Sequence, residues 1–547
     1  MIEILESRIA PASVFVFTDV DGDHVTISSS KGDLNTAGVV TLGNATQAAV
    51  GFRHQLMSLQ LGAAFSGASI TITAKPSLDL GGTQLQGDGF VNVGEINARA
   101  MNQTPIDLKS VTIHGDLGQI IVGSGTGTAP ALGSLDVQSM GIFGLTTGAT
   151  SANSYFMNGV KSITVAQDVD AVQLRAEADT GVAHPDAKIG SVFVGGNLIG
   201  GAATGTGEIV ADGIGSVKIM QSVIGGSATD TGRIAASNKG TIGSVYIGGS
   251  LIGGSAQATG AVYASTTLGS VTVKQSVVGG SAITSGGIDG ESIGSVAIGG
   301  DLRGTTFSSA NSVDHTAFIR AQKDLKSVTI GGSIISGSES GGGTLTFSGA
   351  VQAGLTLGTV KVLGNIEGTA TDKVVISGQG FPTGATGDTI PTTHTQDPAI
   401  TSVSIGGTAT YMQVEAGYDL TGMATDGDSQ IGSVTIAGDL IASDIIAGVK
   451  SGNADPTIFG GATDSLIARP AAVTTDGVYA TIASIVVGGQ IEGAGVSGDS
   501  FGIEAQWIKS FKTGGLKLPL MAGAGNDGFA LGITTNRDVH VRELGGK

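Results

Sequence analysis

One phrase recurs along the sequence, and its spacing restricts the folds that the chain can adopt. It reads as an apolar residue, Gly, Ser, and then two apolar residues that flank one variable residue. The clearest copies lie at residues 189–194, 214–219, 242–247, 268–273 and 293–298. The serines of neighbouring copies are 25, 28, 26 and 25 residues apart. A repeat of this length is typical of a β-helix whose coil contains three short strands. The sequence therefore predicts an all-β, right-handed parallel β-helix, that is, a β-solenoid.

Weaker copies extend the array in both directions. Their centres are Ser110, Ser134, Ser162, Ser327, Thr359, Ser402, Ser433, Ser484 and Ser510. Together the copies predict about fourteen coils of roughly 25–29 residues. Steps of 43 residues (359 to 402) and 51 residues (433 to 484) predict loop insertions near residues 372–398 and 443–480. We expect an N-terminal cap at 1–104 with a hairpin and the first irregular coils, the solenoid array at 105–515, and a C-terminal cap at 516–547.

The alternation within the phrase predicts which side chains face the core. Val217 and Ile219 flank Lys218, so the two apolar residues should point inward and the lysine outward. Ile214 stands three positions before Val217, which breaks the alternation and predicts a bend between them. Glycine pairs such as Gly195-Gly196 are expected to form the other corners, because glycine adopts positive φ without strain.

Composition excludes several classes of partner. The chain carries 27 Lys and Arg against 45 Asp and Glu, a net charge of −18, whereas nucleic acids and anionic membranes attract basic surfaces. We therefore expect no nucleic-acid partner. There is no cysteine, so the fold depends on packing and hydrogen bonds without disulfides. No apolar run reaches the roughly 18 residues of a membrane-spanning helix, so no transmembrane segment is expected.

Three carboxylates lie close together near the N-terminus, at Asp19, Asp21 and Asp23. Hard cations such as Ca²⁺ prefer several oxygen ligands at such spacing, so these residues are the candidate metal ligands. The EF-hand pattern fails, because His24 replaces its glycine and Ser30 its glutamate. The alternative is a solvated hairpin turn, which also favours Asp and Gly. We expect no required cofactor.

The sequence offers no convincing catalytic residues. A serine nucleophile needs an adjacent base, and none of the seven histidines recurs in register with the serines. Hydrogen bonding at stacked bends explains the serines more simply. Many carbohydrate-cleaving enzymes are β-helices, but their sites need clustered carboxylates and aromatic platforms, and this chain has one Trp and six Tyr. We expect a protein that is not an enzyme, and a carbohydrate-binding or carbohydrate-cleaving β-helix remains the alternative.

A family resemblance adds to these inferences. Residues 5–12, Leu-Glu-Ser-Arg-Ile-Ala-Pro-Ala, resemble the N-terminal signature of many large repetitive proteins of bacteria with elaborate envelopes. The Asp-rich segment at 17–27 and the glycine-rich coils resemble the rest of those proteins. The resemblance implies an exported or surface-attached protein, although no export segment is legible before residue 5. We therefore expect an extracellular or cell-surface structural or adhesive protein. It would self-associate into fibres or a layer through its solenoid ends or loops, and surface glycans are further candidate partners.

Overall fold

A computed structural model describes residues 13–43, 46–47, 52–78, 85–99, 104–124, 129–176, 187–308, 312–381, 396–469, 477–495, 499–532 and 538–545. The N-terminal signature at residues 5–12 lies outside these ranges. The chain forms two compact units, Met1–Gly248 and Gly249–Lys547. The described residues contain strands and two 3-10 helices but no α-helix. Most strand pairs are parallel, which confirms the predicted all-β, solenoid-like architecture.

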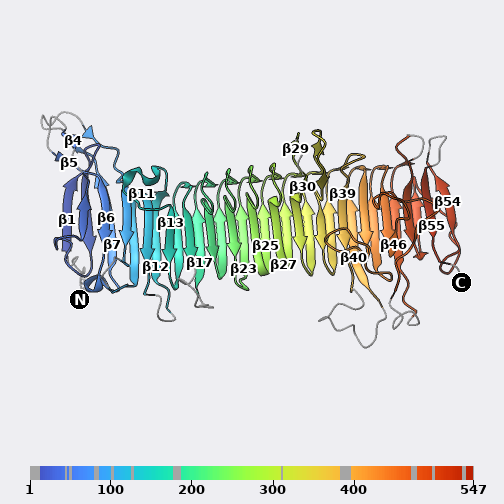
Figure 1. Cartoon of the computed structure of the whole chain (residues 1–547), viewed down its shortest axis with the longest axis horizontal. Helices are drawn as coiled ribbons and strands as arrows, with labels where there is room; N and C mark the ends of the chain where they lie inside the picture. The colour runs from blue at the N-terminus through green and yellow to red at the C-terminus, as the bar shows by residue number, and fades with distance from the viewer. Residues whose placement is uncertain are drawn as a thin grey trace, which may run out of the picture. The chain divides into compact units, whose positions relative to one another are not determined.

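In unit 1 the recurring phrase forms one parallel ladder, here called the serine ladder (Figure 1, blue to green). Its strands are β7 (Ser69–Lys75), β11 (Leu108–Val122), β12 (Leu132–Met140), β14 (Gly159–Val165), β17 (Lys188–Val194), β20 (Gly213–Ile219) and β23 (Ile242–Ile247). The predicted central serines pair in register along this ladder, at Ser110, Ser134, Ser162, Ser191, Ser216 and Ser244. The 25-residue spacing therefore identified the strand pairing correctly in this unit.

Two further parallel ladders complete unit 1. The two-residue ladder contains β15 (Val169–Asp170), β18 (Leu198–Ile199) and β21 (Val223–Ile224). The covered ladder contains β6 (Leu56–Gln60), β10 (Val93–Asn97), the end of β11, β13 (Asn153–Phe156), β16 (Gln173–Ala176), β19 (Glu208–Ala211) and β22 (Arg233–Ala236). We call it the covered ladder because side chains on both of its faces are shielded from solvent. In β19, for example, every residue is buried although successive side chains point to opposite sides of the strand.

An antiparallel hairpin precedes these ladders, as predicted. Strand β1 (Ser13–Thr18) pairs with β2 (His24–Ser29), and β2 pairs with β7. The remaining elements of unit 1 are β3 (Val40–Leu42), β4 (Thr46–Gln47), β5 (Phe52–Arg53), β8 (Ser77–Leu78), β9 (Leu85–Gln86) and the 3-10 helices η1 (Ala63–Phe65) and η2 (Gly144–Thr147). Strand β7 places its Ile70 and Ile72 in the core beside Val111 and Ile113 of β11, so the serine ladder begins before residue 105.

Unit 2 contains the same three kinds of ladder (Figure 1, green to red). Its serine ladder contains the second halves of β25 (Ala261–Val273) and β27 (Ser285–Ile298), then β32 (Leu325–Ile330), β37 (Leu357–Val362), β40 (Pro398–Ile405), β43 (Gln430–Ile436), β48 (Thr481–Val487), β51 (Trp507–Ile508) and β52 (Phe511–Thr513). Here too the predicted centres pair in register, at Ser270, Ser295, Ser327, Thr359, Ser402, Ser433 and Ser484.

The other ladders of unit 2 run beside it. The two-residue ladder contains β24 (Leu251–Ile252), β26 (Val277–Val278), β28 (Leu302–Arg303), β33 (Ile334–Ile335), β38 (Ile366–Glu367), β41 (Ala409–Thr410), β44 (Leu440–Ile441) and β49 (Ile491–Glu492). The covered ladder contains the first halves of β25 and β27, then β31 (Thr316–Ala321), β36 (Val351–Ala353), β39 (Val374–Gly378), β42 (Met412–Ala416), β45 (Asp444–Ala447), β50 (Phe501–Ala505) and β55 (Val539–Glu543).

Short strands outside the ladders mark the loops and the C-terminal end of unit 2. They are β29 (Thr306–Phe307), β30 (Val313–Asp314), β34 (Ser338–Glu339), β35 (Leu345–Thr346), β46 (Val449–Lys450), β47 (Ser465–Leu466), β53 (Leu516–Lys517) and β54 (Gly528–Leu531). At the two predicted insertions, β39 and β45 still belong to the covered ladder, so the additional residues follow these strands. The second insertion packs Phe459 into an apolar cluster with Tyr418, Ile446, Val449 and Ile467.

The predicted alternation is confirmed, although the bend lies inside a continuous strand. In β20, Ile214, Val217 and Ile219 are buried and Lys218 is exposed. Gly215 occupies the bend because a Cβ there would lie 2.3 Å from the carbonyl oxygen of Gly190 on the preceding coil. The residue that breaks the alternation is therefore a glycine, at a point where the backbones of neighbouring coils lie close together.

The explanation predicted for the glycine pairs is wrong. Gly195 and Gly196 are absent from the positive-φ residues of the described chain, and a Cβ at Gly195 would lie 2.1 Å from the Ala166 oxygen. Glycine is needed there because neighbouring coils approach closely. Positive φ occurs instead at the end of a turn that joins the two-residue ladder to the covered ladder, as at Gly207 with φ of 62°.

That turn has its own sequence, Gly-Gly-x-Ala-x-x-Thr/Ser-Gly, at residues 200–207, 225–232, 253–260 and 279–286. In the second copy, the buried Thr231 hydroxyl accepts a hydrogen bond of 2.9 Å from the Gly226 N–H. It donates one of 2.7 Å to the Ala228 oxygen. Thr206, Thr259 and Ser285 make the equivalent pair of bonds. One hydroxyl thus satisfies two backbone groups that the tight turn removes from water.

Candidate metal centres

The predicted aspartates meet in the turn between β1 and β2. Asp19 and Asp23 are buried and Asp21 is exposed, and the three offer carboxylate oxygens that all lie within 4.8 Å of one another. Oδ1 of Asp19 accepts hydrogen bonds from the N–H groups of Gly22 (3.1 Å) and Asp23 (2.8 Å). We name these three residues the N-terminal aspartate cluster. Hydrogen bonds from the backbone of the turn hold the Asp19 carboxylate in place, and a hairpin turn without a metal would form the same bonds.

A second segment reaches the same cluster from the loop after β9. The Gly89 N–H donates to Oδ2 of Asp23 at 2.7 Å, and the Asp88 N–H donates to Oδ2 of Asp21 at 3.1 Å. Gly87 is required beside the cluster, because a Cβ there would lie 1.9 Å from Oδ1 of Asp23. That buried oxygen has no hydrogen-bond donor among the described residues. Burial and the neighbouring Asp21 raise the pKa of Asp19 to about 8. A buried oxygen without a donor, in a group of carboxylates, suits a Ca²⁺ ligand set.

A second aspartate group was missed from the sequence. Asp397, Asp426 and Asp428 are all fully buried in unit 2, and their carboxylate oxygens also lie within 4.8 Å of one another. We name them the buried aspartate triad. Burial, and then the adjacent carboxyl groups of Asp428 and Asp397, raise the pKa of Asp426 to about 11. The triad is split by 29 residues in the sequence, so no local spacing indicates it.

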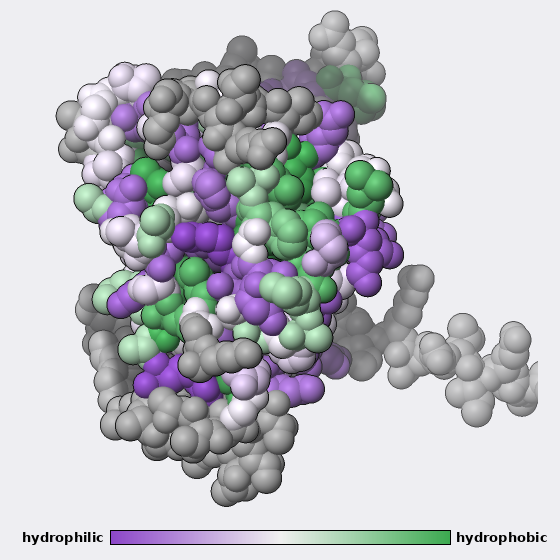
Figure 2. Space-filling model, turned by 90° about the vertical axis from the view of Figure 1, so that its right-hand side faces the viewer, coloured by the Kyte–Doolittle hydropathy of each residue, from purple (hydrophilic) through white to green (hydrophobic). Residues whose placement is uncertain are grey.

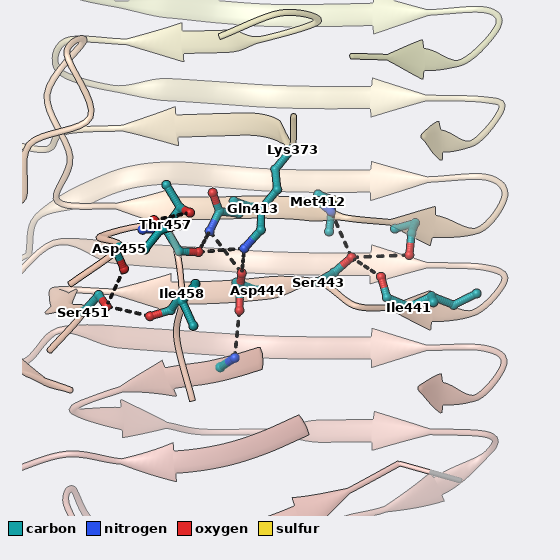
Figure 3. A network of polar contacts seen from close by, with 12 residues as sticks. Lys373, Met412, Gln413, Ile441, Ser443, Asp444, Ser451, Asp455, Thr457 and Ile458 are labelled. Carbon is teal, nitrogen blue, oxygen red and sulfur yellow. Dashed lines mark hydrogen bonds and ion pairs between the residues drawn. The ribbon is translucent and has the colours of Figure 1, made fainter. Parts of the chain in front are cut away.

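A buried polar network crosses the covered ladder in unit 2 (Figure 3). The Lys373 ammonium lies 3.1 Å from Oδ2 of Asp444 and donates to the Thr457 oxygen at 2.6 Å. Gln413 Nε2 donates to the same two acceptors at 3.0 and 2.7 Å, and the Gly502 N–H donates to Oδ1 of Asp444 at 2.8 Å. Because Thr457 belongs to the second insertion, this network fastens that loop over the ladder.

Further carboxylates of the covered ladder are equally shielded from solvent. Burial, followed by repulsion from Asp444, raises the pKa of the Glu415 carboxyl to about 8. Glu504 is buried beside Arg542, whose Nε donates to its Oε1 at 2.7 Å, and Arg542 also lies 3.3 Å from Asp464. Both acids are buried, and Glu504 is joined through Arg542 to Asp464 of the second insertion.

Serines of the serine ladder and the buried His315 form hydrogen bonds or ion pairs within the fold. Oγ of Ser162 donates to the Gly133 oxygen at 3.5 Å, and Oγ of Ser402 donates to Oγ1 of Thr359 at 3.3 Å. His315 is buried between Asp314 (2.7 Å) and Gln352 (3.0 Å). These contacts agree with the prediction that the serines bond to neighbouring coils.

Comparison of the chain with protein-family models, with curated proteins and with solved structures found no match. Among the described residues, no helix has the length and apolar character needed to cross a membrane.

Proposed function

We propose that this chain is a non-catalytic structural or adhesive β-solenoid that acts outside the cell or at its surface and self-assembles into fibres or a layer. The observation that carries the proposal is the in-register stacking of the serine ladder through each unit. Internal strands of such a stack are hydrogen-bonded on both sides, which suits a rigid spacer. Our proposal includes the right-handed winding and the roughly fourteen coils that the repeat spacing predicts.

The outward positions of the serine ladder support a passive role. In unit 1 they are Thr71, Thr112, Asp136, Thr164, Phe193, Lys218 and Tyr246. In unit 2 they are Thr272, Ala297, Thr329, Lys361, Ser404, Thr435, Val486 and Lys512. This surface carries a single carboxylate, whereas a glycan-cleaving face needs several. On the covered ladder of unit 2, the carboxylates of Glu415, Asp444 and Glu504 are buried. A carbohydrate-binding or carbohydrate-cleaving β-helix is therefore the weaker alternative.

Exposed apolar side chains on β1 and near the C-terminal end of unit 2 offer surfaces for self-association. Val14 and Val16 alternate on β1 and are 44% and 53% exposed. At the C-terminal end of unit 2, Leu516 and Met521 are exposed, and Figure 2 shows apolar and polar side chains interspersed on this end. Strand edges and apolar side chains at the ends of a stacked sheet are its natural sites of association. Localisation at the cell surface follows from the resemblance of the N-terminal signature and stays part of the proposal.

Electron microscopy of the purified chain, with EDTA or with millimolar Ca²⁺, tests this function. Filaments or sheets are the expected result, and a requirement for Ca²⁺ would connect assembly with the N-terminal aspartate cluster. The variant Asp21→Asn, which alters the exposed ligand of that cluster, is the matched control for the metal. Isolated particles in both conditions would rule out the polymer, and glycan-binding assays would then test the carbohydrate alternative.

A further inference from the structure

The buried aspartate triad lies where two neighbouring strands of unit 2 begin. Asp397 directly precedes β40, and Asp426 and Asp428 lie just before β43. Strands β40 and β43 pair in parallel, with Ser402 opposite Ser433. The Gln430 N–H also donates to the Asp397 backbone oxygen at 2.7 Å. Because β40 and β43 are parallel, the residues that directly precede them lie at the same edge of the ladder. We call these residues, 397 before β40 and 426–429 before β43, the lead-in segments.

Two partners of the triad are well placed, but one oxygen lacks a partner. Arg469 Nη2 lies 2.8 Å from Oδ2 of Asp428, and the Phe381 N–H donates to Oδ1 of Asp397 at 2.9 Å. Oδ2 of Asp426 is buried and has no hydrogen-bond donor within the described parts of the chain. An unbonded carboxylate oxygen in the interior is costly, so its retention indicates a ligand.

Glycine keeps the space in front of this oxygen open. Gly380 has φ of 87°, and a Cβ at this position would lie 2.6 Å from Oδ2 of Asp426 and 2.8 Å from Oδ1 of Asp397. Two oxygens from separate segments thus face one point at the glycine. Any side chain at residue 380 would displace them, whereas glycine leaves both oxygens accessible to a small ion.

Charge balance identifies the kind of ligand. Three carboxylates and the paired Arg469 guanidinium amount to a net charge of −2 when all are ionised, and burying uncompensated charge is strongly unfavourable. A divalent cation would neutralise this set. Within the described residues the site contains three carboxylates and no nitrogen or sulfur ligand. This set favours Ca²⁺, because Mg²⁺ usually retains water with one or two carboxylates and Zn²⁺ prefers His and Cys.

We propose that Asp397, Asp426 and Asp428 form an internal Ca²⁺ site that ties the lead-in segments of β40 and β43 together. The site is separate from the N-terminal aspartate cluster and belongs to the other unit. Because the triad is fully buried, Ca²⁺ would be acquired during folding and released slowly. The competing explanation is that protons shared among the carboxyl groups neutralise the triad without any metal.

The test is Ca²⁺ stoichiometry on the full chain. Each variant is refolded with Ca²⁺, dialysed to remove loose ions, and analysed by atomic emission alongside its thermal unfolding midpoint in Ca²⁺ and in EDTA. Asp426→Asn should lose one Ca²⁺ per chain relative to the wild type and lose the Ca²⁺-dependent rise in midpoint. The control Asp116→Asn alters a buried carboxylate outside both clusters and should retain the wild-type ion content.

A second variant keeps the test decisive if Asp426→Asn does not fold. The triple variant Asp19→Asn, Asp21→Asn, Asp23→Asn removes the N-terminal cluster and leaves unit 2 intact. Retention of one Ca²⁺ per chain by this variant supports the proposal. Absence of Ca²⁺ in the triple variant would overturn the proposal. Equal ion content in the wild type and a folded Asp426→Asn would also overturn it, and would assign the triad to shared protons.

Discussion

Lys373 and Asp444 form a buried ion pair across the covered ladder, with Nζ 3.1 Å from Oδ2 and side chains 9% and 0% exposed. Lys373 directly precedes β39, whereas Asp444 begins β45, and β42 lies between them in the ladder. The pair therefore connects coils that are not adjacent. Burial raises the pKa of Asp444, and the lysine opposes that effect. The stability of this region should depend on keeping both charges or neither.

Replacing the lysine alone tests this dependence. Lys373→Met should lower the free energy of unfolding of unit 2 by about 3–5 kcal/mol, because it leaves a carboxylate buried without its cation. The double variant Lys373→Met, Asp444→Asn should lose less than the sum of the two single variants. Urea unfolding followed by circular dichroism measures both effects. The exposed pair Lys323 and Glu291 is the control, and Lys323→Met should cost at most about 1 kcal/mol.

The hydroxyl-closed turns give a second prediction. Thr231→Val retains the shape of the side chain but leaves the Gly226 N–H and the Ala228 oxygen without their shared partner. We expect a loss of about 1–3 kcal/mol in thermal or urea unfolding of unit 1. Thr112→Val, on the exposed side of β11, should change stability by no more than about 0.5 kcal/mol. Equal effects of the two variants would show that the turn does not depend on the hydroxyl.

The ladders were predictable because their signal is periodic. Stacked coils place equivalent residues opposite each other, so the spacing from Ser191 to Ser216 in the sequence becomes a strand pair in the structure. Asp19, Asp21 and Asp23 were predictable as a group because alternate residues of one turn are neighbours. The turn phrase at residues 225–232 also repeats in the sequence, and its recurring Thr or Ser before Gly was the signal that could have revealed the buried hydroxyls.

The buried charges were not predictable, because they depend on what covers them. Asp444 in β45 and Glu415 in β42 are both buried, whereas their charge alone would place them at the surface. Thr457 of the second insertion accepts hydrogen bonds from Lys373 and Gln413 beside Asp444, a contact that the strand sequences do not indicate. The buried aspartate triad joins segments separated by strands β40, β41 and β42, so its proximity follows from strand pairing alone. The glycine pairs were located correctly but explained wrongly, because the distance between neighbouring coils is a tertiary property that one coil does not reveal.

The close approach between the backbones of neighbouring coils leads to a third prediction. A Cβ at Gly331 would lie 2.3 Å from the Gly299 oxygen, and the residue does not have positive φ. Gly331→Ala should therefore destabilise unit 2 by about 1–3 kcal/mol through steric overlap with the backbone. Gly528→Ala is the matched control, since a Cβ there meets nothing within 4 Å. Differential scanning calorimetry of both variants distinguishes close packing from a general intolerance of alanine.

The raised pKa of the Glu415 carboxyl leads us to expect a loss of stability toward alkaline pH. Burial and Asp444 raise the pKa of its carboxyl to about 8 from the ordinary 4.5, with Lys373 acting in the opposite direction. Between these pH values the folded chain holds a proton that the unfolded chain has released. The free energy of unfolding therefore falls as pH rises, by up to about 1.4 kcal/mol per pH unit. The effect ends above the folded pKa, where both states are ionised.

Glu415→Gln should remove this dependence, because the amide imitates the neutral acid at every pH. The variant and the wild type should have similar unfolding free energies near pH 4.5, and the variant should exceed the wild type by about 4–5 kcal/mol above pH 8. Urea unfolding of both chains at half-unit steps from pH 4.5 to 9 measures the difference. Glu367→Gln, on the exposed side of β38, should follow the wild-type curve. Parallel curves for the wild type and Glu415→Gln would mean that Glu415 is ionised in the fold, with Lys373 as the adjacent cation that compensates it.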